Sequence, residues 1–230
     1  MKMIGILGGM SWESSTTYYR TINQAVKQRL GGLASARLIL YSYNFDDIES
    51  RQRSGAWEEL TEIMISGAKS LQAAGADCVI IATNTMHKMA DNVAAAIDIP
   101  FLHIVDGTAE AIKNANMSRV GLLGTRFTME EEFYPGRFRN KHGIDIVIPE
   151  ESDRQLIHDV IFGELCAGKI EMLSREQVLR IINDLAAHGA EGVILGCTEI
   201  GLLVKPEDVS VPLFDTTIIH ANMAVDWALK

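Results

Sequence analysis

Residues 75–85 read GADCVIIATNT and residues 189–199 read GAEGVILGCTE, so one pattern recurs in this chain. The offset is 114 positions, from Gly75 to Gly189, and it aligns Thr83 with Cys197. Other pairs keep nearly the same spacing: IGILGG at 4–9 with VGLLGT at 120–125, and Pro100 with Pro212. A repeat that spans each half of a chain indicates a duplicated structural unit. The sequence therefore predicts two similar lobes.

Short apolar runs alternate with longer amphipathic stretches along the whole sequence. Runs of four to six residues flanked by Gly, Pro or Asp, such as 78–82 and 192–195, are typical of buried parallel strands. The segments 57–74 and 176–187 place apolar residues at helical spacing, and each leads into a copy of the repeated motif. We predict an α/β fold of two lobes related by a pseudo-twofold axis, each with a mainly parallel sheet flanked by helices.

No Gly/Ser-rich or Pro-rich linker divides the halves, so the repeat itself sets the expected boundaries. The first α/β lobe is expected at 1–114 and the second at 115–213, with a crossing near 114–119. Residues 214–230 are expected to form a C-terminal helix that returns to the first lobe.

Composition excludes several classes of protein. The chain has 230 residues, 47% of them hydrophobic, and a net charge of −9, so it can bury a large core but offers no basic surface for nucleic acid or an anionic membrane. No apolar run is long enough for a membrane helix or a secretory signal, which predicts a cytoplasmic protein. Cys78, Cys166 and Cys197 lack CxxC spacing, so we expect free thiols and no zinc site.

The repeat places two different side chains at equivalent positions, Thr83 and Cys197. Ligands of open α/β sheets bind beyond the carboxyl ends of the strands, where both residues fall. If the lobes face each other, the two side chains line opposite walls of one cleft, which is the geometry that inverting a carbon centre requires. A helix starting after Thr198 would favour the Cys197 thiolate. The alternative is an ordinary buried cysteine.

Three motifs carry a family resemblance: IGILGGMS at 4–11, ATNTMH at 82–87 and GCTEI at 196–200. They resemble the aspartate/glutamate racemase family, and within it the bacterial racemases of broad specificity, over essentially the whole chain. The resemblance implies two α/β lobes, a homodimer, and two opposed cysteines working without pyridoxal phosphate or metal. The usual first motif is CNT, so this sequence departs from the pattern at Thr83.

The resemblance also assigns roles to the two opposed residues. Cys197 is expected to take the α-proton from an L-amino acid such as aspartate, glutamate or homoserine, and Thr83 to donate a proton from the opposite face. Because a hydroxyl is a much weaker acid than a thiol, turnover should be slow.

Substrate-binding residues follow from the same resemblance. The expected partners of the α-carboxylate are Met10, Ser11, Asn84, Thr85, Thr125 and Thr198, and Glu199 is the candidate for the ammonium group. Backbone amides at helix N-termini supply attraction for a carboxylate independently of any motif. His87 either tunes this site or caps the following helix.

The substrate side chain has two candidate partners. Lys169 matches a family lysine, whereas the family arginine falls on an ambiguous register of Arg51, Gln52 and Arg53. If Gln52 takes that place, selection for a dicarboxylate relaxes and neutral homologues can enter. The two arginines are otherwise solvated charges on a loop.

Two other functions stay open from the sequence. A related fold with Cys197 alone could act as a decarboxylase or as a cis-trans isomerase of diacids. A chain that lacks one base could also be an amino-acid-binding protein without catalysis.

Overall fold

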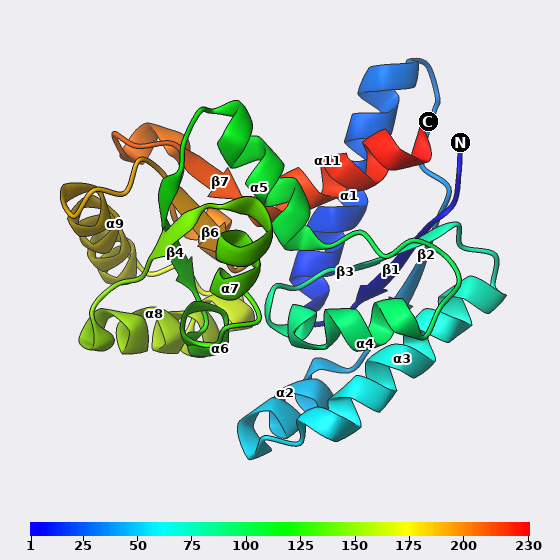
Figure 1. Cartoon of the computed structure of the whole chain (residues 1–230), viewed down its shortest axis with the longest axis horizontal. Coiled ribbons are helices and arrows are strands. Elements are labelled where there is room, and N and C mark those ends of the chain that lie inside the picture. The colour runs from blue at the N-terminus through cyan, green and yellow to red at the C-terminus, as the bar shows by residue number, and fades with distance from the viewer. The chain divides into compact units, whose positions relative to one another are not determined.

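The computed structural model describes residues 1–230, which form two compact units. The first contains residues 1–104 and 220–230, and the second contains residues 105–219. Figure 1 shows a parallel sheet with helices on its faces in each unit. The predicted α/β fold with two parallel sheets is therefore confirmed. No helix combines the length and the apolar character that crossing a membrane would require.

The first unit is built around three parallel strands in the order β2-β1-β3. An isolated parallel bridge between Val79 and Phe101 extends this sheet beyond β3. The elements along this part of the chain are β1 (Ile4–Gly8), α1 (Trp12–Leu30), β2 (Leu38–Ser42), α2 (Phe45–Ser54), α3 (Trp57–Ala73), β3 (Cys78–Ile81), η1 (Thr85–Met89) and α4 (Ala90–Ala95).

Side chains of β1 and β3 alternate between the two faces of the first sheet, as the pleat of a strand requires. On one face Ile6 and Ile80 pack with Tyr18 of α1 and with Val225 near the C-terminus. On the other face the buried cluster contains Leu7, Val79 and Ile81 with Met64 and Leu71 of α3. Helices thus cover both faces, which explains why these strands are apolar throughout (Figure 1).

The second unit contains a four-stranded parallel sheet in the order β5-β4-β6-β7. Its elements are α5 (Ile104–Asn114), β4 (Arg119–Gly124), α6 (Arg126–Glu130), α7 (Pro135–Arg137), η2 (Phe138–His142), β5 (Asp145–Val147), α8 (Glu151–Gly163), η3 (Leu165–Ala167), α9 (Met172–Ala187), β6 (Val193–Gly196), α10 (Ile200–Leu203), η4 (Pro206–Asp208), β7 (Leu213–Asp215) and α11 (Thr216–Ala228). The first residue of α5 belongs to the first unit, as does α11 from His220 onward.

The strand register is the same in both units. Gly5 of β1 pairs with Val79 of β3, and Gly121 of β4 pairs with Val193 of β6. These are the positions that the sequence repeat aligns. The next pairing repeats as well, because the amide of Val79 donates to Pro100 and that of Val193 donates to Pro212, both at 2.9 Å.

The helices that enter the repeated motifs end in the same way. Gly75 after α3 and Gly189 after α9 have φ angles of 92° and 91°, a region that glycine enters without steric cost. In both turns the next amide donates back to a leucine, Leu71 in the first unit and Leu185 in the second, at 3.0 Å.

Those two leucines also lie close to a glycine of the central strand in each unit. A Cβ atom at Gly5 would come within 2.9 Å of Cβ of Ala76 and 3.3 Å of Cβ of Leu71, and one at Gly121 within 3.0 Å of Cδ1 of Leu185. In each unit a glycine of the central strand therefore lets the helix lie close against the sheet. The duplication extends from the backbone to side-chain packing.

Candidate functional site

Cys197 is the first residue after β6, and it is where the chain leaves the core of the second unit. All four residues of β6 are buried, whereas Cys197 is partly exposed. Thr125 follows β4 in the same way, and the last residues of those two strands, Gly124 and Gly196, are paired. Since paired parallel strands lie about 4.8 Å apart, Thr125 and Cys197 leave the sheet side by side at its carboxyl edge.

The Cys197 thiol is held by the carboxylate of Glu199. Its Sγ–H donates to Oε2 of Glu199 at 3.0 Å, and the hydroxyl of Thr198 donates to the same oxygen at 2.5 Å. Glu199 is itself buried, with 4% of its surface exposed. Burial, the charge of Glu199 and the nearby Cys166 thiol together raise the pKa of Cys197 well above its usual value. At neutral pH the resting side chain is a thiol.

This finding corrects the expectation that a helix end favours the thiolate. The helix after Cys197 is α10, a single turn, and the residue that precedes it is Glu199. A carboxylate in contact with the sulfur opposes ionisation of the thiol, whereas a one-turn helix has only a small dipole to favour it.

Thr83 occupies the equivalent place in the first unit. It is the first partly exposed residue after β3, because Ala82 is still buried. Its carbonyl accepts a hydrogen bond of 2.8 Å from Nδ1 of His87, and the carbonyl of Ala82 accepts one of 3.2 Å from Ser14 of α1. The opposition of Thr83 and Cys197 across one cleft stays a prediction.

The remaining polar residues expected in the first unit are buried around the carboxyl ends of β1 and β3. Met10 and Ser11 follow β1 and are 5% and 2% exposed, and Asn84 and Thr85 are buried just after Thr83. Ser11 is the N-cap of α1, where its side chain accepts from the amide of Ser14 at 3.3 Å. These residues share one edge of the sheet.

In the second unit, Thr125 and Thr198 lie at the corresponding edge. Thr125 is buried and caps α6 by accepting from the amide of Thr128 at 3.3 Å. Thr198 is partly exposed next to Cys197. Lys169 is exposed on the segment after η3, and no hydrogen bond from its amino group joins it to the other predicted residues.

The structure distinguishes the three candidates near the end of α2. Arg51 and Arg53 point outward, where they pair with Glu59 at 3.2 Å and Glu49 at 3.1 Å. Gln52 is buried between them, with 6% of its surface exposed. Its amide nitrogen contacts Sδ of Met86 at 3.0 Å, and Met86 follows the Thr83 motif. Of the three, Gln52 alone packs inward, and whether it meets a substrate stays a prediction.

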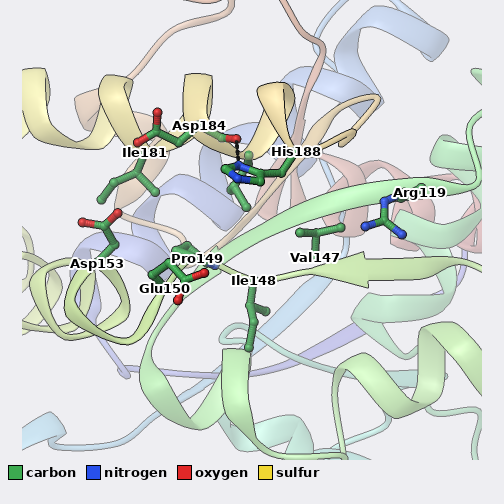
Figure 2. A pocket seen from close by; sticks show the side chains of 10 residues that line it. Arg119, Val147, Ile148, Pro149, Glu150, Asp153, Ile181, Asp184 and His188 are labelled. Carbon is green, nitrogen blue, oxygen red and sulfur yellow. Dashed lines mark hydrogen bonds between the residues drawn. The ribbon is translucent and has the colours of Figure 1, made fainter.

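A separate cavity of about 330 Å³ in the second unit contains none of the predicted residues (Figure 2). Its lining includes Val147 and Ile181, with Asp153, Arg119 and His188 among the polar groups. Arg119 begins β4 and His188 follows α9 just before β6, so this side of the cavity lies at the amino ends of these two strands. Cys197 is at the opposite edge of the sheet.

Sequence reasoning underestimated His87. It is 2% exposed and its Nδ1 bonds to the carbonyl of Thr83, whereas a cap of the following helix was one of the two roles expected. The spacing of four residues between Thr83 and His87 is the signal that was available, because residues four apart meet on one side of a helical turn. Its second partner, the amide of Ile104, has no local signal in the sequence.

Comparison with known proteins gives a consistent assignment. Residues 7–224 match the family model described as Asp/Glu/Hydantoin racemase. The Bacillus subtilis protein named broad specificity amino-acid racemase RacX is 23% identical over 226 residues, which cover 97% of this chain and 96% of the relative.

Solved structures agree with that match. A structure from Yersinia pestis, provisionally described as an Asp/Glu racemase, is 51% identical with a TM-score of 0.94 and full coverage of both chains. An aspartate racemase homologue from Pyrococcus horikoshii is 35% identical with a TM-score of 0.87, again over the full length of both chains.

Proposed function

Because the chain belongs to the Asp/Glu/Hydantoin racemase family, we propose that it racemises aspartate, glutamate and short polar amino acids such as homoserine without pyridoxal phosphate. The observation that supports this most strongly is the equivalence of Thr83 and Cys197. Each is the first partly exposed residue beyond a buried strand, and the two strands have the same register in two copies of one fold.

Cys197 is proposed as the base that acts on the L-enantiomer. The resting thiol must first lose its proton, and the Glu199 oxygen that accepts the Sγ–H bond is placed to take it. The α-ammonium group of a bound substrate would bring positive charge to this buried carboxylate and sulfur, which favours the thiolate. The thiolate then removes the α-hydrogen as a proton and leaves a carbanion.

Thr83 is proposed as the acid on the other side of that carbanion. Its hydroxyl gives a proton to the opposite face of Cα, which produces the D-enantiomer, and the oxygen regains a proton from solvent. The equilibrium constant of racemisation is one, so kcat/KM must be equal for the two enantiomers, however different the maximal rates. A weak acid at Thr83 therefore slows both directions.

Buried amide and hydroxyl groups are proposed to hold the substrate. Ser11, Asn84, Thr85, Thr125 and Thr198 surround the α-carboxylate, together with Met10 as an apolar wall. Gln52 faces the substrate side chain. Its neutral amide has N–H donors and a carbonyl acceptor, so it can form hydrogen bonds with a hydroxyl as well as with a carboxylate. This supports a substrate range that includes homoserine. Lys169 is proposed as a second partner of a side-chain carboxylate, and the family resemblance supports a homodimer.

Hydrogen exchange in heavy water tests the proposal. L-aspartate, L-glutamate or L-homoserine should lose its α-hydrogen to solvent, and Cys197→Ala should abolish that loss. Cys78→Ala is a matched control, because Cys78 is fully buried in β3 and has no part in the chemistry. A folded protein that binds these amino acids without exchanging them is a binding protein and not a racemase.

One observation favours a second candidate. A thiol that is protonated at rest suits an enzyme that only protonates a carbanion, such as a decarboxylase of substituted malonates. Release of carbon dioxide from a malonate, with no α-hydrogen exchange on amino acids, would identify the protein as a decarboxylase and not as a racemase.

A further inference from the structure

Buried side chains hold both peptide planes that flank Thr83. Ser14 donates to the carbonyl of Ala82 at 3.2 Å, and His87 donates to the carbonyl of Thr83 at 2.8 Å. The exposed fractions of Ser14 and His87 are 3% and 2%. Because a peptide unit is planar, each bond orients a whole plane, and the two planes together set φ and ψ of Thr83. The direction of its Cα–Cβ bond is thereby fixed.

The hydrogen bonds of His87 also fix its tautomer. The amide of Ile104 donates to Nε2 at 3.2 Å, and since an amide N–H only donates, Nε2 must be the accepting nitrogen. The ring proton of neutral His87 is then on Nδ1, which faces the carbonyl of Thr83. Phe101 and His103 pack against the ring, with centroids 5.7 Å and 4.6 Å away. The donor is therefore oriented by contacts on several sides.

The second unit has no counterpart of this histidine. At the repeat offset of 114 positions, His87 corresponds to Gly201. The carbonyl of Cys197 instead accepts from the amide of Ile200 at 3.2 Å. A histidine bonded to the carbonyl of the motif residue is therefore found at Thr83 in the first unit and not at Cys197 in the second. A hydroxyl has little acidity of its own, so its contribution depends on how well it is placed.

We propose that Ser14 and His87 are positioning residues for Thr83, which keep its Oγ1 aimed at the face of Cα opposite to Cys197. The inference rests on the proposed racemase function. It concerns the return of a proton from the Thr83 side and leaves proton removal by Cys197 unaffected.

Because Cys197 removes the proton and Thr83 returns one to the other face, displacing Thr83 changes the products of the reaction in a way that a general loss of stability would not. In heavy water, the Cys197 side alone yields L-substrate that carries deuterium at Cα, which is exchange with retention. Formation of D-enantiomer, which is inversion, also needs Thr83. A displaced Thr83 should lower inversion while exchange with retention persists, whereas partial unfolding should lower both in the same proportion.

Three substitutions of His87 separate its two bonds. His87→Asn places an amide nitrogen near the position of Nδ1 and keeps a donor for Thr83. His87→Gln places its amide near Nε2 and keeps a partner for Ile104, and His87→Leu removes both bonds. We expect Gln and Leu to reduce the ratio of inversion to retentive exchange by at least about 10-fold, and Asn to keep it within about 3-fold. Ser14→Ala should shift the ratio in the same direction as Leu.

A matched control exists in the second unit. His188 also donates from Nδ1 to the carbonyl four residues earlier, that of Asp184, at 2.7 Å (Figure 2). His188→Leu should leave the ratio unchanged. Equal ratios for His87→Asn and His87→Gln, or a proportional fall of both reactions in every variant, would overturn the inference. If the unsubstituted protein shows neither exchange nor inversion, the proposed racemase function itself fails.

Discussion

The sulfur of Cys197 lies 3.0 Å from Oε2 of Glu199, and the thiol donates its proton toward a carboxylate buried beside it. The carboxylate has two opposing effects on the chemistry. Its negative charge raises the pKa of the thiol, so the reactive thiolate is scarce at rest. It also offers an acceptor for the proton that the thiol must lose.

Glu199→Gln separates these effects. Removal of the charge should lower the pKa of Cys197, because the carboxylate is one of the causes that raise it. Turnover should nevertheless fall by about 100-fold, the usual scale of losing a general base. Ultraviolet titration of the thiolate and chiral assay of the product measure the two quantities. Faster turnover together with easier ionisation would show that Glu199 only inhibits.

The pH dependence of the reaction follows from the same raised pKa. A group whose pKa is raised is mostly protonated below that pKa, and here the protonated form is inactive as a base. In the proposed mechanism Glu199 takes that proton, so the enzyme loses no net proton to solvent, and kcat/KM for L-substrates should stay nearly constant through the neutral range. A rise of about 10-fold per pH unit would mean that the thiol loses its proton to solvent before the substrate binds, and that Glu199 is not the acceptor.

Thr83→Cys should accelerate the reaction. A thiol near its ordinary pKa of about 8.5 gives and takes protons at neutral pH far more readily than a hydroxyl does. We expect kcat/KM to increase at least about 10-fold for both enantiomers, since the equilibrium constant ties the two values together. The gain should be easiest to detect with D-substrates in a circular dichroism assay. Unchanged kinetics in a folded variant would show that Thr83 does not take part in the reaction.

The duplicated packing predicts matched losses of stability in the two units. Gly5→Ala pushes a methyl group against Ala76 and the carbonyl of Cys78, and Gly121→Ala pushes one against Leu185. Each substitution should lower the free energy of unfolding by about 1–3 kcal/mol, the usual cost of overpacking. Gly163→Ala is the control, because a Cβ atom there would meet no neighbour within 4 Å. Urea denaturation measures all three, and equal stability of all three would disprove the packing argument.

Much of the fold was predictable because the repeat and the strand pattern are local features of the sequence. The motif helix expected at 57–74 is α3 at Trp57–Ala73, and the strand expected at 192–195 is β6 at Val193–Gly196. The helix expected at 176–187 begins earlier, at Met172. Its first turn was missed because Met172 and Leu173 are exposed and break the apolar stripe.

The site was less predictable than the fold, because its electrostatics depend on contacts that a pattern does not record. The sequence aligned Thr83 with Cys197, but it did not reveal that Glu199 turns back to the sulfur and raises its pKa. The sequence could not tell which of Arg51, Gln52 and Arg53 points inward. The fold of α2 buries Gln52 and leaves the two arginines outside. Long-range bonds such as His87 to Ile104 likewise require the folded chain.

The central claim is that a sulfur and a hydroxyl act on opposite faces of one carbon. A crystal structure of the protein with a bound acidic amino acid would test it most directly. The account predicts Cα of the ligand between Sγ of Cys197 and Oγ1 of Thr83, each within about 3.5 Å of that carbon. A ligand that contacts Cys197 while Thr83 lies remote from its Cα would contradict the account.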